Sequence, residues 1–155
     1  MKKLIMIIGA VMFTAMTFAQ VNFSGTWNIN KEKSKLGEPS FAPKEIVIVQ
    51  AENVLTLESH SEWDGQAMTT TDKYTLDGKE CINKGMMDSQ KKSVATWSED
   101  KTSLKIVSKI PFQENEMTIT EVFKLENGAL IYQSNASSSF GDFAETRVYD
   151  KKVSQ

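Results

Sequence analysis

The residue types that catalysis and metal binding need are scarce in this sequence. His60 is the only histidine and Cys81 the only cysteine, so a zinc site would have to consist mainly of carboxylates. No Ser-His-Asp order, phosphate-cradling glycine loop or paired-carboxylate motif occurs. We therefore predict no catalytic residue, no metal and no cofactor. His60 is expected on the surface of a strand, and Cys81 is expected as a small buried apolar side chain.

Arg147 and Tyr149 are the pair of side chains best suited to bind a ligand. Their spacing of two residues places both on the same face of a strand. A buried guanidinium needs an anionic partner, and a ligand carboxylate could supply it with two parallel hydrogen bonds. Glu121, on an apolar face with Ile119 and Phe123, is a second candidate. It could pair with Arg147 inside the protein, and the sequence leaves both partners open.

These side chains must be positioned by β-strands, because the chain after residue 20 is almost a continuous series of strand patterns. Ile46-Val47-Ile48-Val49 is a β-branched run typical of a buried strand. Segments 103–110 and 117–125 alternate between apolar and polar residues, which is the period of half-buried antiparallel strands. The expected strands are 23–30, 45–50, 54–63, 68–76, 81–86, 93–97, 103–110, 117–125, 130–136 and 143–149.

Short turns are expected to join these strands into hairpins. Asp64-Gly65, Asp77-Gly78 and Asn127-Gly128 are dipeptides that two-residue hairpin turns prefer. A meander of strands closes more readily than it stays open, because closure removes the exposed edges. We predict an all-β fold, an antiparallel up-and-down barrel of about 8–10 strands, with a β-sandwich as the alternative. Segment 134–139 is expected to be a mobile loop or a long hairpin before the last strand.

Residues 1–19 have the three parts of an export signal. Two lysines precede an apolar stretch that ends at Phe18, and Thr17 and Ala19 are the small residues of a cleavage site. The apolar stretch is shorter than the roughly 18 to 20 residues that a spanning helix needs. We expect cleavage to leave residues 20–155 as one exported domain without a stable membrane anchor. The pattern is compatible with a periplasmic or an extracellular location.

The charge balance argues against nucleic acid as a partner. The whole chain has 18 Lys and Arg residues and 20 Asp and Glu residues, a net charge of −2. Without the two lysines of the signal, 16 basic residues stand against 20 acidic ones, a net charge of −4. A mildly acidic domain lacks the basic surface that binding to phosphate backbones requires. The sequence does not identify a protein partner.

Both ends of the domain resemble the calycins, the superfamily of lipocalins and intracellular fatty-acid-binding proteins. Phe23-Ser24-Gly25-Thr26-Trp27 is similar to the first strand of these barrels, and Thr146-Arg147-Val148-Tyr149 is similar to the last. The chain also resembles small exported bacterial proteins of the lipocalin-like kind. The resemblance implies a lipocalin-like barrel whose base is closed by Gly25, Trp27 and Arg147, with the Arg147 guanidinium lying across Trp27.

The same resemblance implies an anchor for a ligand. In fatty-acid-binding proteins an Arg and a Tyr two residues further on hold a carboxylate, so Arg147 and Tyr149 are the ligand-binding candidates. Those proteins also cap the barrel mouth with a pair of helices. Segment 31–43 is short for two helices and contains two prolines, so the presence of a lid stays open.

Three functions are compatible with these features. The first is an exported binding protein that holds a small hydrophobic or amphipathic ligand, such as a fatty acid, in the barrel. The second is a structural or interaction barrel that is filled by its own side chains and acts through outer loops such as 37–43 and 137–142. The third and most remote is a small hydrolase or isomerase that uses an interior carboxylate. We predict the binding protein, and no enzyme.

The export signal generates the first testable prediction. The secreted protein should begin at or near Gln20, because Ala19 is the best small residue after the apolar stretch. Intact-mass analysis of secreted material measures this directly. A membrane-bound product that still carries Met1 would contradict it.

Overall fold

The computed structural model describes residues 19–112 and 114–153, without the side chain of Trp63. The expected export signal up to Phe18 lies outside the described residues. In the described part the chain forms ten strands and one short 3₁₀ helix, η1. The elements are β1 (Gly25–Ile29), β2 (Glu45–Ala51), β3 (Val54–Trp63), β4 (Gln66–Thr75), β5 (Glu80–Lys84), η1 (Met86–Asp88), β6 (Gln90–Trp97), β7 (Ser103–Phe112), β8 (Asn115–Glu126), β9 (Ala129–Ser138) and β10 (Gly141–Lys151).

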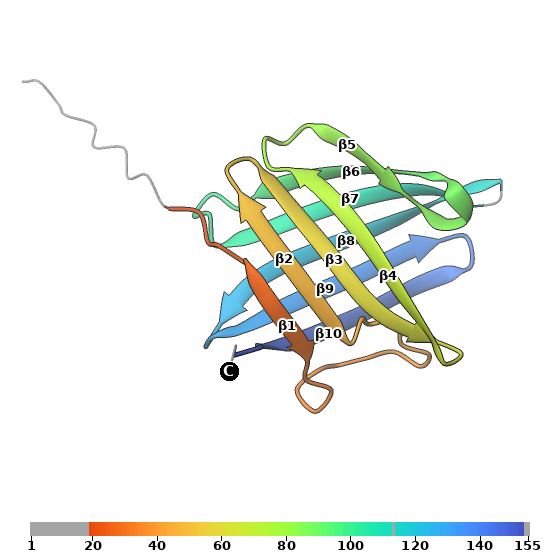
Figure 1. Ribbon diagram of the computed structural model, residues 1–155. Coiled ribbons are helices and arrows are strands. Elements are labelled where there is room, and N and C mark those ends of the chain that lie inside the picture. The colour runs from red at the N-terminus through yellow and green to blue at the C-terminus, as the bar shows by residue number, and fades with distance from the viewer. Residues whose placement is uncertain (1–18, 113, 154–155) are drawn as a thin grey trace, which may run out of the picture.

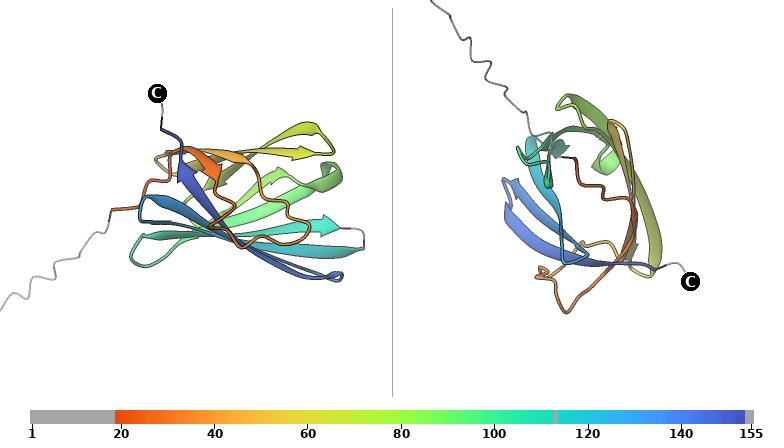
Figure 2. Two further views of the ribbon diagram at one scale, coloured as in Figure 1. Left: turned by 90° about the horizontal axis from the view of Figure 1, so that it is seen from below. Right: turned by 90° about the vertical axis from the view of Figure 1, so that its left-hand side faces the viewer.

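The ten strands form one antiparallel sheet that curls into a nearly closed barrel (Figure 1). Their order is β4-β3-β2-β1-β10-β9-β8-β7-β6-β5, so each strand pairs with the next one in the chain except β4 with β5, and β1 also pairs with β10. Seen from one end, the sheet bends round into a ring (Figure 2). The predicted all-β, up-and-down barrel is confirmed, and the sandwich is not formed.

Two of the three predicted glycine turns have the expected backbone. The φ angles are 50° and 74° in Asp64-Gly65 and 49° and 79° in Asn127-Gly128, as two-residue hairpin turns require. In Asp77-Gly78 only the glycine has a positive φ, of 76°. The Asp77 carboxylate instead accepts a hydrogen bond of 3.1 Å from the backbone N–H of Lys79. The chain therefore turns here without forming a hairpin ladder, and the prediction of a β4–β5 hairpin is wrong.

Aromatic side chains fill one end of the barrel, which we call the base. Trp27 is 2% exposed, and its indole N–H donates a hydrogen bond of 3.0 Å to the carbonyl oxygen of Phe23. The ring of Phe23 is stacked on Trp97 with a centroid distance of 5.8 Å, and it also contacts Phe123. These contacts lock the segment before β1 into the barrel, so the base is a packed core rather than an opening.

The base contains a cation over Trp27, but it is not the predicted one. The Lys151 ammonium lies 5.4 Å from the Trp27 ring centroid, whereas the Arg147 guanidinium lies 5.0 Å from the ring of Tyr132. The register explains the difference, because β1 and β10 pair Trp27 with Lys151. Arg147 stands four residues earlier on β10, about 13 Å further along the strand. The predicted stacking of Arg147 on Trp27 is therefore wrong.

Gly25 belongs to the same base. Its φ is 146°, and a Cβ at this position would lie 2.9 Å from the Lys151 Cε. A larger residue would push away the lysine that covers Trp27. The positive φ therefore favours glycine at this position.

Burial of Trp27 generates the second prediction. Trp27→Ala should lower the free energy of unfolding by about 3 to 5 kcal/mol, because a large aromatic ring and its hydrogen bond are lost from the core. Urea unfolding followed by circular dichroism would measure it. Ile82→Ala, on the exposed face of β5, is the control and should cost about 1 kcal/mol or less. Equal losses in the two variants would contradict the core position of Trp27.

Candidate ligand-binding site

The wall of the barrel has one seam, between β4 and β5. In the described part of the chain, β4 forms a ladder only with β3, and β5 only with β6. The side-chain amide of Asn83 bridges the two strands instead. It accepts a hydrogen bond of 2.7 Å from the backbone N–H of Lys73 and donates one of 3.0 Å to the carbonyl oxygen of the same residue. One side chain thus replaces a row of backbone hydrogen bonds.

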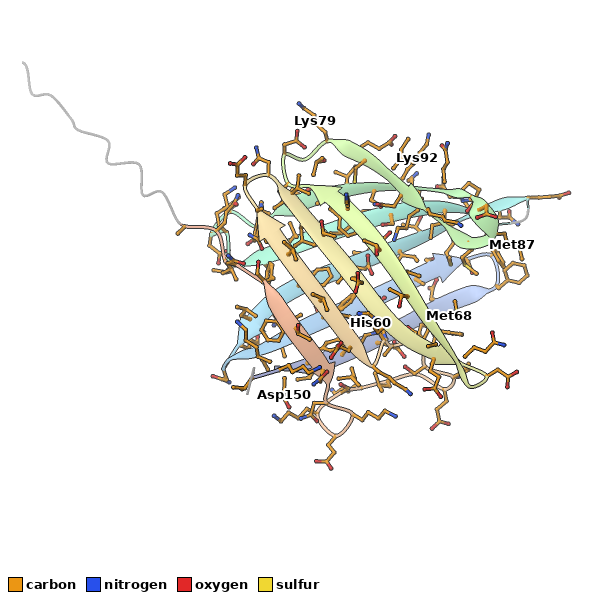
Figure 3. All side chains as sticks on the ribbon, in the orientation of Figure 1. His60, Met68, Lys79, Met87, Lys92 and Asp150 are labelled. Atoms are coloured by element: carbon orange, nitrogen blue, oxygen red, sulfur yellow. The ribbon has the colours of Figure 1, made fainter. Side chains whose placement is uncertain are left out.

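A cleft opens where β4 and β5 separate. Its volume is about 530 Å³, and strands from both sides of the seam contribute to its lining. The lining residues are Met68, Thr69, Thr70, Thr71, Asp72, Lys84, Gly85, Met86, Met87, Lys91 and Ile110. Met68 and Met86 are half exposed and Met87 is almost fully exposed. Both Met68 and Met87 lie toward the same end of the barrel (Figure 3). Flexible, polarisable methionine side chains suit a surface that must adapt to apolar molecules of different shape.

Gly85 precedes η1, the turn that carries Met86 and Met87, and there is no space for a side chain at this position. A Cβ on Gly85 would lie 2.6 Å from the Ser89 Oγ and 3.3 Å from a methyl carbon of Ile110. The Gly85 N–H donates to the Ser89 carbonyl oxygen over 2.7 Å. The absence of a side chain thus lets the turn around η1 lie directly against Ile110 at the edge of the cleft.

An ion pair crosses the seam inside the cleft. The Lys91 ammonium lies 2.5 Å from the Asp72 carboxylate, and the two side chains are only 13% and 16% exposed. Lys91 belongs to β6 and Asp72 to β4, so the pair connects strands that share no ladder. The Lys91 ammonium also donates to the Tyr74 hydroxyl over 3.4 Å. Burial raises the pKa of Tyr74 well above its usual value, and the negative charges of Glu121 and Asp72 raise it further.

Strands β6 to β9 also carry polar side chains on the inner wall. Tyr132 donates a short hydrogen bond to the Glu121 carboxylate. Burial raises the pKa of Tyr132 well above its usual value, and the neighbouring Glu121 charge adds to the effect, so the hydroxyl keeps its proton and acts as the donor. Ser93 and Ser108 share a hydrogen bond of 2.8 Å between strands β6 and β7. The interior thus combines an apolar base with a polar middle layer.

Arg147 and Tyr149 lie on the inner face of β10, as their spacing predicted, and each has a partner within the protein. The Glu145 carboxylate accepts a hydrogen bond of 2.8 Å from the Arg147 Nε, and the Arg147 Nη2 lies 2.7 Å from the same carboxylate oxygen as an ion pair. The Tyr149 hydroxyl donates to the Pro43 carbonyl oxygen over 3.2 Å. The proposed pairing of Arg147 with Glu121 is wrong, because Glu145 stands two residues away on the same strand face and lies closer.

Glu145 also fastens the segment between β1 and β2. Its carboxylate accepts a hydrogen bond of 3.0 Å from the backbone N–H of Gly37, and the Phe143 ring lies so close that a Cβ on Gly37 would be 2.5 Å away. Burial raises the pKa of Glu145, but hydrogen bonds from Ser40, Gly37 and Arg147 outweigh it and lower the pKa below its usual value. This segment forms turns and no helix pair, so a helical lid is absent from residues 31–43.

Asp72 and Lys91 were not identified as residues of the site in the sequence analysis. Polar residues inside strands are usually assigned to the solvent face. Their positions along the strands indicate the inner face. Asp72 shares its strand face with Tyr74, and Lys91 shares its strand face with Ala95; both of these neighbours are fully buried. Segment 134–139 proved to be the end of β9 and a tight turn, the hairpin of the two alternatives.

His60 and Cys81 were the other side chains considered for chemistry. His60 is partly exposed, with its Nε2 2.9 Å from a Glu58 carboxylate oxygen. The Cys81 thiol is partly buried and donates to the Ser93 carbonyl oxygen over 3.4 Å. Residues 19–112 and 114–153 contain no cluster of three metal-binding side chains. They also contain no helix long and apolar enough to cross a bilayer.

Solved structures share this arrangement of strands. Zebrafish ileal bile-acid-binding protein, complexed with cholic acid, is 19% identical with a TM-score of 0.58, over 84% of this chain and 98% of that chain. A secretory abundant heat soluble protein from Ramazzottius varieornatus is 14% identical with a TM-score of 0.63, over 87% and 98%. The fatty-acid-binding protein of Schistosoma mansoni, in complex with arachidonic acid, is 15% identical with a TM-score of 0.53, over 84% and 96%.

The fold is calycin-type. No protein-family model and no curated protein matches the chain. At these levels of identity the likeness concerns the fold alone. What this calycin-type barrel does must therefore be argued from its own cleft and interior.

The ion pair in the cleft generates the third prediction. Asp72→Asn should lower the free energy of unfolding by about 2 to 4 kcal/mol, because the Lys91 ammonium keeps its burial and loses its counter-ion. The control is Asp88→Asn. Asp88 is also 2.5 Å from a lysine, Lys84, but both side chains are exposed, and water screens the pair. Urea unfolding should separate the variants clearly, and equal stabilities would show that the buried pair does not support the seam.

Proposed function

We propose that this protein is an exported binding protein that holds a small hydrophobic or amphipathic molecule inside its barrel. The observation that carries the proposal is the cleft between β4 and β5. Its apolar outer part is formed by methionines, and its inner part reaches the charged pair of Asp72 and Lys91. Export is inferred from the N-terminal pattern of residues 1–19.

The dimensions and chemistry of the cleft support this function. Its volume of about 530 Å³ is within the range of small-molecule sites. Such sites are mainly apolar with a few polar groups that orient the ligand, and the methionine rim above a polar interior has this composition. Two structural neighbours were solved with cholic acid and arachidonic acid, molecules with a large apolar part and one acidic end. We propose binding rather than catalysis on this basis.

The carboxylate-binding role of Arg147 and Tyr149 stays a prediction. Both side chains face the interior, but a carboxylate would have to compete with Glu145 for the guanidinium and with Pro43 for the hydroxyl. A self-filled barrel that acts through its outer loops is the alternative, and it predicts that apolar probes find no interior site.

The fourth prediction tests the cleft as the binding site. The uncharged dye Nile red should bind to the wild-type protein with a fluorescence increase at micromolar concentration. Met68→Glu should weaken this binding by about tenfold, because a carboxylate at the rim must lose water when an apolar molecule covers it. Fluorescence titration gives both affinities.

Ile82→Glu is the matched control for this experiment. Ile82 is an exposed apolar residue like Met68, but it lies on the outer face of β5 and does not line the cleft. The substitution adds the same charge and should leave the affinity for Nile red unchanged. Absence of dye binding to the wild type, or equal weakening by the two substitutions, would refute binding in the cleft.

A further inference from the structure

Three polar side chains form a row across the inner wall, one row beyond Phe123 of the base and closer to the opposite end of the barrel, which we call the mouth. Ser134 on β9 is paired in register with Glu121 on β8 and with Glu145 on β10, so the three residues are neighbours on the same face of the sheet. Next to this row toward the mouth, the register aligns Ile119, Ala136 and Phe143. A polar row deep in the barrel, followed by apolar side chains, suits a molecule that enters with its polar end first.

The interior charges do not balance. Lys91 is paired with Asp72, and Arg147 is paired with Glu145. Among the residues that the structure describes, Glu121 forms no ion pair, and the hydrogen-bond partner of its carboxylate is the neutral Tyr132 hydroxyl. Both interior cations are thus neutralised by a carboxylate, and one carboxylate remains without a cation.

The Ser134 hydroxyl supplies a second polar group without a partner in the protein. Ser134 is only 8% exposed, and its Oγ makes no hydrogen bond to any residue within 19–112 or 114–153. The buried unpaired side-chain atoms of these residues are the Ser89 Oγ and the Trp97 Nε1, so the Ser134 Oγ remains accessible and can hydrogen-bond to a molecule that enters the barrel. An unpaired hydroxyl beside an uncompensated carboxylate marks a place where a ligand group can bind.

We propose that this place binds the protonated amine of a long-chain amphiphile. An ammonium group has three N–H donors and a positive charge. It can donate to the Glu121 carboxylate and to the Ser134 hydroxyl, and its charge compensates Glu121. The apolar chain then extends past Ile119 and Phe143 toward the mouth. The inference rests on the proposed function, and it adds the chemical class of the ligand.

The same geometry disfavours a fatty acid. A ligand carboxylate in this row would bring a second negative charge next to Glu121, and neither Lys91 nor Arg147 is free to compensate it. An alcohol of the same chain length could donate to Glu121 without adding charge. The expected order of affinity is therefore amine, then alcohol, then carboxylate.

Competition with Nile red tests this order. Dodecylamine and dodecanoate, each below its critical micelle concentration at pH 7, and dodecanol, below its solubility limit, are titrated against the dye-loaded protein. Dodecylamine should displace the dye at a concentration at least tenfold lower than dodecanoate, since a hydrogen bond to a charged group contributes about a factor of ten or more. Equal displacement, or stronger displacement by dodecanoate, would overturn the proposal.

Two substitutions test whether Glu121 and Ser134 cause the preference for the amine. Glu121→Gln should weaken dodecylamine binding by about tenfold and narrow its advantage over dodecanoate, while Nile red still binds. Ser134→Ala should weaken the amine by about threefold to tenfold, and it also serves if Glu121→Gln does not fold. Glu126 is exposed on the same strand, so Glu126→Gln removes a negative charge from the surface and should leave the affinities for dodecylamine and dodecanoate unchanged.

The two proposals fail in different ways. If Glu121→Gln and Ser134→Ala both leave the amine affinity unchanged while the dye binds, the headgroup assignment is wrong and the binding function stands. If neither the dye nor any of the three amphiphiles binds to the wild type, the binding function itself is refuted.

Discussion

Backbone hydrogen bonding holds this barrel together at every boundary between strands except one. The pairing of β1 with β10 joins the two ends of the domain, and the aromatic base depends on it because it places Lys151 over Trp27. The boundary between β4 and β5 lacks a ladder, and the side chain of Asn83 spans it. The cleft lies at this boundary because the strands are free to separate there.

The interior polar groups are a consequence of the same architecture. A lysine and an aspartate that are mostly removed from water are costly to desolvate, so their mutual attraction must be strong to be retained. Lys91 and Asp72 belong to strands that no ladder connects, and their pairing supplies a contact across the seam. Arg147 and Glu145, by contrast, sit on one strand, and they attach the segment around Gly37 to the barrel wall. Both pairs thus combine a structural contact with a polar lining.

Much of the fold could be predicted from the sequence, since alternation along strands and glycine turns are local features. The strands around Leu104 and Ile119, and the turns at Asp64-Gly65 and Asn127-Gly128, followed from these features. The seam could not be predicted in this way. At Asp77-Gly78 the dipeptide favours a tight turn, but a side-chain hydrogen bond selects a different one.

The interior partners were harder still to predict. The sequence shows that Arg147 and Glu121 face inward, but their partners depend on the register of strands that are distant in the chain. The stacking over Trp27 depends on the same register, which brings Lys151 and not Arg147 opposite the ring. Spacing within one strand determines a face, and pairing between strands determines the neighbour.

The seam has a mechanical consequence. In a fully paired barrel the circumference is fixed, because any widening would break a whole ladder of hydrogen bonds at once. Here the amide of Asn83 and the ion pair of Lys91 and Asp72 are the links that widening must stretch first. Widening at the seam would therefore change the circumference of the barrel at the cost of these two links, while the nine strand pairings stay intact.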